Sequence, residues 1–280
     1  MQRLGTAFNG FTIEASDGKV GNVRDFLFDD HTWMLRWLVV DTGTWLSGRK
    51  ILIHPSSLHR PDIEGRAFEA ALTRDQVEKS PDIQQNEPVS QQMERNLYGY
   101  YGYNPSWGGG FYGVDAGAYP VREALPVSDP APQGPAGTPA EPTNADPHLR
   151  SVAEVKGYDI RAIDGEVGHL HDFLIDDEDW SIRYLVIDTR NWWFGKHVVV
   201  SPGAIKEINW AERFIRLDLT CYKIKGSPPW DQTGLMDRAY EAVLHTYYGW
   251  GTMTEGPVAP VVAVAPPAAV KPVPAPVAGA

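Results

Sequence analysis

The chain contains two copies of one sequence, related by a constant offset. Adding 147 to a residue number in 11–103 gives its partner in 158–250 without a gap, and 31 of these 93 aligned positions are identical. Self-similarity at a fixed spacing indicates a duplicated structural unit. The chain therefore has to fold as two similar modules, each of which forms its core within about a hundred residues.

The segments between and after the copies differ in composition from the copies themselves. Residues 104–150 and 251–280 are rich in Pro, Gly and Ala, and such segments bury too little apolar surface to offset chain entropy. We predict a first module over 1–103, a disordered linker over 104–150, a second module over 151–250 and a disordered tail. A flexible linker of this length spans roughly 40 Å, so the two modules could pair or act separately.

Each copy has the pattern of several short β-strands. The Asp-Gly pairs at 17–18 and 164–165 predict hairpins, because glycine tolerates the positive φ of a tight turn. The strings VGNVRDFLFD, WMLRWLVVDT and KILI have counterparts of the same character, VGHLHDFLID, WSIRYLVIDT and HVVV, and further short strands are expected near 66–72 and 213–219. Five or six strands without βαβ alternation predict a small, mainly β barrel.

An amphipathic helix is expected after each barrel. Apolar residues recur every four positions, namely Val89, Met93, Leu97 and Tyr101 in the first copy and Met236, Tyr240, Leu244 and Tyr248 in the second. Ser90 and Asp237 are the expected N-caps. The repeated Trp33 and Trp180, Phe26 and Phe173, and Leu38 and Leu185 are interpreted as core residues.

The string DGKVGNVRDFLFDDHTWMLRWLVVDTG and its copy DGEVGHLHDFLIDDEDWSIRYLVIDTR resemble the PRC-barrel family. LTRDQVEKSP and LTCYKIKGSPP, followed by helices that end in YYGY and YYGW, resemble an extension that accompanies this barrel in many bacterial proteins. The resemblance implies two small SH3-like barrels that contact other macromolecules and do not catalyse a reaction. The family's barrel also occurs in the photosynthetic reaction-centre H subunit and in a ribosome-maturation factor.

The composition indicates which kinds of partner the protein binds and in which cellular compartment it lies. The formal net charge is −11, which argues against a dedicated nucleic-acid binder, because such binding rests on Lys and Arg. The single cysteine, Cys221, cannot form an intrachain disulfide, and no stretch approaches the roughly 20 apolar residues of a membrane span. A cytoplasmic protein is expected, and association with a membrane complex from outside the bilayer stays open.

No catalytic or cofactor-binding motif occurs in the sequence, so we expect no enzymatic activity, no cofactor and no metal. The acidic turn 176–179 lacks EF-hand spacing, and its counterpart contains His31 and Thr32. His169 and His171 lie two apart on a predicted strand, a spacing that zinc can use. Their counterparts, Asn22 and Arg24, favour an ordinary polar outer face instead.

Aromatic residues in loops and at helix ends are the candidates for binding a partner. These are Trp45, Trp192, Trp193, Phe194, Tyr100, Tyr101, Tyr247, Tyr248 and Trp250, although the helix-end residues could instead dock each helix on its barrel. The leading hypothesis is a protein-interaction or assembly module that binds an unidentified protein through two tethered barrels. The alternatives are an accessory of photosynthetic electron transfer, similar to the H subunit, and an accessory of ribosome or RNA processing.

Overall fold

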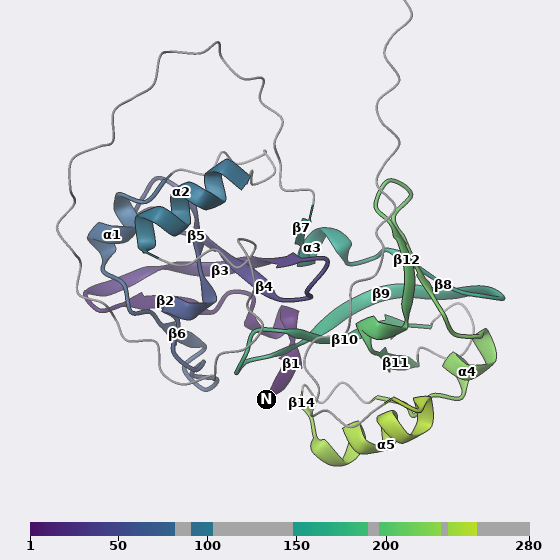
Figure 1. The fold of residues 1–280 in the computed structure, drawn as a ribbon. Coiled ribbons are helices and arrows are strands. Elements are labelled where there is room, and N and C mark those ends of the chain that lie inside the picture. Colours follow the sequence, from purple (N-terminus) through teal and green to yellow (C-terminus); the bar gives the residue numbers. More distant parts are fainter. Residues whose placement is uncertain (82–90, 103–147, 190–195, 231–234, 251–280) are drawn as a thin grey trace, which may run out of the picture. The chain divides into compact units, whose positions relative to one another are not determined.

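The structure is a computed structural model, and it describes residues 1–81, 91–102, 148–189, 196–230 and 235–250 (Figure 1). Among the described residues, 1–81, 148–189, 196–230 and 235–250 belong to one compact unit, and residues 91–102 belong to a second. The predicted tail and nearly all of the predicted linker lie outside the described residues.

The protein is mainly β, as predicted, with one curved sheet for each repeat. The strands of the first repeat are β2 (Thr12–Ala15), β3 (Gly18–Asp29), β4 (Leu35–Asp41), β5 (Lys50–Ile53) and β6 (Ala67–Glu69), in the order β5-β4-β3-β2-β6. Those of the second are β8 (Asp159–Ala162), β9 (Gly165–Asp176), β10 (Ile182–Asp188), β11 (His197–Val200), β12 (Ile205–Asn209) and β13 (Phe214–Leu217), in the order β11-β10-β9-β8-β13-β12. Both predicted hairpins are present, between β2 and β3 and between β8 and β9.

Each sheet also contains a strand from the other repeat (Figure 1). Strand β1 (Gln2–Leu4) pairs antiparallel with β9 of the second repeat, and β7 (Leu149–Ser151) pairs antiparallel with β3 of the first. β1 and β7 are related by the same offset of 147 as the rest of the duplication. The exchange is therefore reciprocal, and it joins the repeats in one unit. Of the two arrangements that the sequence left open, pairing and separate action, the structure has the paired one.

Aromatic side chains from both repeats form a shared core between the sheets. Trp180 lies within 6.5 Å, ring centre to ring centre, of Phe8, Phe26 and Phe68. On the other side, Phe173 lies 5.6 Å from Phe28. The predicted core residues are all buried. The apolar surface that each repeat buries thus depends partly on the other repeat.

The remaining elements are short, apart from one helix after each barrel. They are η1 (Gly5–Phe8), η2 (Pro55–Ser57), α1 (Arg74–Glu78), α2 (Gln91–Tyr101), α3 (Val152–Val155), η3 (Pro202–Ala204), α4 (Cys221–Lys225), β14 (Leu235–Met236) and α5 (Arg238–Tyr248). The two predicted amphipathic helices are α2 and α5, and Asp237 caps α5 by accepting a hydrogen bond from Tyr240 N at 2.6 Å. Val89 and Ser90 lie outside the described residues.

Met236, the first residue of the four-residue spacing, lies in β14, immediately before the predicted N-cap Asp237. There it pairs with Gln2 of β1, so a strand from the opposite end of the chain extends this segment. Its side chain still joins Leu244 in the core beneath α5, which explains why the four-residue spacing continued through it.

Candidate functional site

The aromatic residues at the end of α5 mostly pack inward. Tyr248 and Trp250 stack with ring centres 4.3 Å apart and pack against the core cluster that contains Tyr184 and Leu244. Burial raises the pKa of Tyr248 well above its usual range. Two of the nine candidate residues thus serve to dock α5 on its barrel.

The other candidates fall in several places. Trp45 is half-buried, with the Arg74 guanidinium 4.3 Å from its ring centre. Tyr100 and Tyr101 form an edge-to-face pair on α2, and Tyr100 is 40% exposed. The candidates Trp192, Trp193 and Phe194 lie outside the described residues.

Tyr247 differs from its neighbours because it borders an apolar surface. It lines a shallow groove of about 420 Å³ with Pro228, Ala242, Val243 and Thr246. Tyr222 on α4 is 85% exposed and Val243 is 54% exposed. Burial and then the neighbouring Tyr222 raise the pKa of Tyr247. We call these six residues the α4–α5 face.

The α4–α5 face is specific to the second repeat. The residues at the positions of Tyr222 and Val243 in the first repeat are Asp75 and Asn96, and Asp75 forms an ion pair with Lys79 at 2.8 Å. Sequence reasoning identified Tyr247 but missed Tyr222, because a tyrosine on a five-residue helix has no periodicity that shows which way it points.

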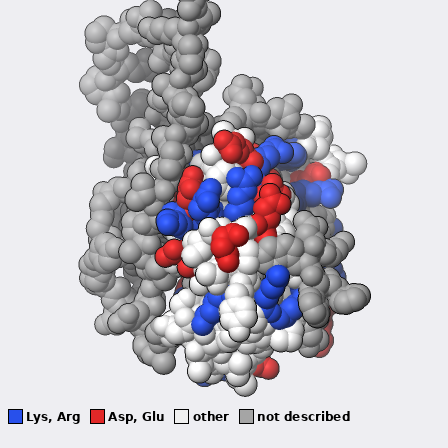
Figure 2. Space-filling model, turned by 90° about the vertical axis from the view of Figure 1, so that its right-hand side faces the viewer, with Lys and Arg blue, Asp and Glu red and all other residues white. Residues whose placement is uncertain are grey.

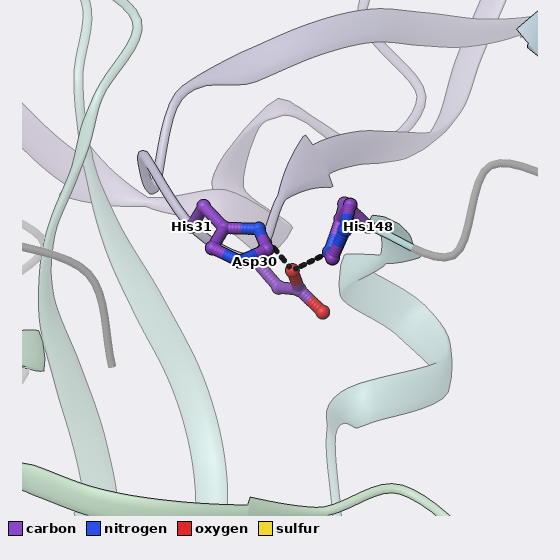
Figure 3. Close-up of side chains that lie close together, drawn as sticks. All are labelled: Asp30, His31 and His148. Atoms are coloured by element: carbon purple, nitrogen blue, oxygen red, sulfur yellow. Dashed lines mark hydrogen bonds and ion pairs between the residues drawn. The ribbon is translucent and has the colours of Figure 1, made fainter. Parts of the chain in front are cut away.

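A buried carboxylate fastens the exchanged strand β7 to the first repeat (Figure 3). The Asp30 side chain is 1% exposed, and its Oδ1 lies 3.1 Å from His148 Nδ1 and 3.4 Å from His31 Nδ1. Its Oδ2 accepts from Arg150 Nε at 3.1 Å. Burial raises the pKa of Asp30 although Arg150 and His148 oppose the rise. Both carboxylate oxygens are thus occupied by groups of the second repeat's N-terminal segment.

The same fastening recurs at the other exchanged strand, where Arg3 Nε lies 3.4 Å from Asp177 Oδ2. The rest of the acidic turn also contacts basic groups of the protein. Asp179 binds Arg183, and Glu178 lies 3.1 Å from Arg60 of the first repeat. The turn that sequence reasoning considered for a cation is used for internal ion pairs.

The other repeated aspartates serve separate local contacts. Asp25 accepts hydrogen bonds from Ser151 Oγ and from Ala153 N, both on the exchanged segment. Asp41 accepts from Gly43 N at 2.8 Å within its own turn. Burial and a hydrogen bond to Asp164 raise the pKa of the Cys221 thiol to about 11, so this thiol is a poor nucleophile at neutral pH.

A group of histidines lies on the second sheet around a buried aspartate. His169, His171 and His197 surround Asp188, whose side chain is fully buried. Sequence reasoning found the first two by their spacing on one strand. Asp188 and His197 join them only through the pairing of three strands, which the sequence does not show.

The charged surface carries both signs. On the face in Figure 2, Lys and Arg side chains alternate with Asp and Glu side chains in the upper part of the described surface, and separate Lys and Arg groups lie among uncharged residues in the lower part. A basic stripe of the kind that tracks a nucleic-acid backbone does not occur on the described part of this face. None of the helices in the described ranges is long and apolar enough to cross a membrane.

Comparison with known proteins gives one match in each of the two repeats. The sequence model of the PRC-barrel domain matches residues 5–77 and 147–219. An uncharacterized protein from Deinococcus radiodurans is 35% identical over 75 residues, which cover 27% of this chain and 27% of that protein. The second matched region includes the exchanged strand β7, whereas the first begins at residue 5, directly after β1.

Proposed function

The chain belongs to the PRC-barrel family, and from this premise we propose that it is a non-catalytic protein-binding module that presents the α4–α5 face to a protein partner. The observation that carries the proposal is Tyr222, which is 85% exposed beside the groove under Val243 and Tyr247. Tyrosine is enriched among the residues that dominate binding energy at protein interfaces.

The scaffold beneath this face is well suited to binding. The Tyr247 hydroxyl donates to Lys223 O at 2.7 Å, and Lys223 Nζ donates to Tyr247 O at 2.7 Å, so α4 and α5 are joined in both directions. A surface that is ordered before the partner arrives loses less conformational entropy on binding. The apolar groove would accept an aliphatic or aromatic side chain of the partner.

The contacts of the carboxylates and of the thiol support a non-catalytic role. Asp25 borders a hollow of about 260 Å³, but hydrogen bonds from Ser151, Ala153 and Phe26 occupy its oxygens. Asp29 and Asp41 have their own separate partners, Arg36 and Arg24. Each of these carboxylates is thus engaged in its own internal contacts. The single cysteine is compatible with a cytoplasmic location, which we include in the proposal.

Affinity purification from the native host tests this proposal. The wild-type protein should retain a protein partner that is lost when Tyr222→Asp and Val243→Asn introduce the first repeat's residues. The partner, identified by mass spectrometry, should bind the purified wild-type protein directly and bind the double variant at least about tenfold more weakly, the equivalent of 1.4 kcal/mol.

A matched control is Ile63→Asn. Ile63 is an apolar residue of the first repeat that is 37% exposed and lies far from α4 in the sequence. Equal binding by wild type and double variant, with loss in the control, would refute the α4–α5 face as the binding surface. A partner released steeply by salt and identified as a ribosomal particle would favour the RNA-processing alternative. A partner identified as a membrane complex would favour the H-subunit-like alternative.

A further inference from the structure

Four side chains of the second repeat meet on one face of its sheet, where strands β9, β10 and β11 lie side by side. Asp188 on β10 is directly opposite His169 on β9 and directly opposite His197 on β11. His171 lies two residues beyond His169, where the pairing of β9 with β10 skips one residue, and its ring centre lies 4.7 Å from that of His197. The register of three strands therefore brings three imidazoles to one carboxylate.

The distances in this group fit ligands around a shared ion better than hydrogen bonds. Nε2 of His169 and Nε2 of His197 each lie 3.8 Å from Asp188 Oδ2, which is beyond hydrogen-bond length. Ligand atoms 2.0–2.2 Å from a tetrahedral zinc are about 3.4 Å from one another. Ligand atoms of His171, Asp188 and His197 all lie within 4.8 Å of one another, so small side-chain rotations close the set.

Burial in this group favours a bound cation. The Asp188 side chain is fully buried, while His197 is 16% exposed and His169 is 40% exposed. A buried carboxylate requires positive charge nearby, and the exposed histidine leaves a path from solvent. The carboxylate lies below and the imidazoles lie toward the surface, which is an arrangement in which an ion can enter.

The first repeat carries permanently charged side chains around the equivalent aspartate, whose side chain is 27% exposed. The residues at the positions of His169, His171, Asp188 and His197 are Asn22, Arg24, Asp41 and Lys50. Arg24 forms an ion pair with Asp41 at 3.2 Å, and a hydrogen bond from Gly43 N and the charges of Arg24 and Lys50 lower the pKa of Asp41. In the second repeat the aspartate is kept, and histidines take the places of Arg24, Lys50 and Asn22.

We propose that His171, His197 and Asp188, with His169 as the neighbouring fourth donor, bind a divalent transition-metal ion of the zinc type. Imidazole nitrogen selects such ions over magnesium and calcium, which prefer oxygen ligands. The ion neutralises the buried carboxylate in the place that Arg24 and Lys50 take in the first repeat. It also cross-links three adjacent strands of the second barrel.

Titration of the untagged, full-length protein with metal tests the proposal. After treatment with a chelator, the wild-type protein should bind one equivalent of Zn²⁺ by calorimetry. With Co²⁺ it should give the visible absorption of a cobalt ion with nitrogen and oxygen ligands. The double variant His171→Arg/His197→Lys carries the first repeat's residues and should bind at least about 100-fold more weakly, since loss of mere outer-shell partners already costs 10–100-fold.

Two further variants locate the ion. His31→Gln/His148→Gln removes the imidazoles around Asp30, the other histidine cluster, and should leave metal affinity unchanged. If His171→Arg/His197→Lys does not fold, the single variant His171→Ala takes its place. The proposal would be overturned by wild-type protein that binds no stoichiometric metal. It would equally be overturned by affinity that survives the loss of His171, or by affinity that is lost only with His31 and His148.

Discussion

His54 and Ser201 occupy equivalent positions in the two repeats, and each caps a short 3-10 helix. His54 Nδ1 accepts from Ser56 N at 3.2 Å, and Ser201 Oγ accepts from Gly203 N at 3.2 Å. Burial and then the charge of Arg36 lower the pKa of His54 to about 4. The imidazole is therefore neutral at pH 7, and the first repeat has a cap that acid can disrupt.

We expect His54→Ser to reduce the loss of stability in acid. The pKa of His54 is lower in the folded protein than its ordinary value of 6.5, so the unfolded chain binds the proton more tightly. Neutral His54 therefore contributes to the free energy of unfolding above pH 6.5. This contribution, about 2 kcal/mol after allowance for partial exposure, is lost as pH falls toward 4. Denaturant unfolding at pH 7 and pH 4.5 measures it. Equal acid sensitivity of wild type and variant would contradict the assignment to His54.

Asp25 is a second residue whose role can be isolated. It accepts hydrogen bonds from Ala153 N and Phe26 N, at 3.0 and 2.8 Å, while burial raises the pKa of its carboxyl. Asp25→Ala should lower the free energy of unfolding by about 2–3 kcal/mol, because it leaves these donors without an acceptor. Asp25→Asn, which keeps an acceptor, should cost less than about 1 kcal/mol.

The pH dependence of these two variants separates charge from hydrogen bonding. Because the pKa of Asp25 is raised above 3.8, protonation favours the folded state, and this contribution is lost as pH rises through the folded pKa. The stability of wild type relative to Asp25→Asn should therefore fall as pH rises from about 4 to 7. Chemical denaturation over this range measures the difference, and a constant difference would show that Asp25 does not titrate as described.

At the scale of elements, the strand exchange depends on two segments of only three residues. β1 and β7 each form only a few backbone hydrogen bonds. An arginine on each strand also forms an ion pair with a buried or nearly buried aspartate of the other repeat: Arg3 with Asp177, and Arg150 with Asp30. Gly10 and Gly157, with φ of 79° and 85°, follow the two segments at equivalent positions. Short strands are thus secured by side chains and turns more than by their own pairing.

Arg150→Ala should weaken the exchange at β7. Removal of one partner from a fully buried ion pair costs about 3–5 kcal/mol, and the Arg150 side chain is 26% exposed, so we expect a loss of about 2 kcal/mol. Protection of β7 amides in hydrogen exchange should fall together with the free energy of unfolding. Asp30→Asn in the same background should recover part of the loss, since a neutral side chain needs no cation. A loss below about 0.5 kcal/mol would show that the pair does not hold the strand.

The sequence predicts the long strands and hairpins well but not the exchange. Strands β3 and β9 show alternating apolar residues with an Asp-Gly turn before them, and these are local signals. QRL and LRS show no periodicity, and their partners lie more than 100 residues away. Arg3 and Gly10 do match Arg150 and Gly157 at the offset of 147, a signal that alignment from residue 11 left out. Only part of the histidine cluster could be predicted from the sequence. His169 and His171 lie on one strand, whereas Asp188 and His197 reach them only through the pairing of neighbouring strands.

At the scale of the whole molecule, the duplication behaves as a dimer joined in one chain. The bridge between Met34 and Ser181 links residues that are themselves equivalent by the offset of 147, so it marks the centre of an approximate twofold arrangement. Leu35 N donates to Trp180 O at 2.8 Å, and Ile182 N donates to Trp33 O at 2.7 Å, on the two sides of this centre. A twofold contact of this kind can also be made by two separate copies of one sequence.

A chain of residues 148–250 alone should therefore form a homodimer. Without β1, strand β9 has an unpaired edge, and the β7 segment of a second copy can fill it, as exchange of identical elements does in domain-swapped dimers. Light scattering during gel filtration should give twice the mass of the fragment. A peptide of residues 1–10 added in excess should convert dimers to monomers, because it supplies the strand that β9 uses in the full chain.

In that fragment Asp172→Ala should weaken the dimer, because Asp172 accepts a hydrogen bond from Thr6 in the full chain and would accept one from the equivalent segment of the second copy. A fragment that is folded and monomeric at high concentration would show that each barrel is complete without the exchanged strand.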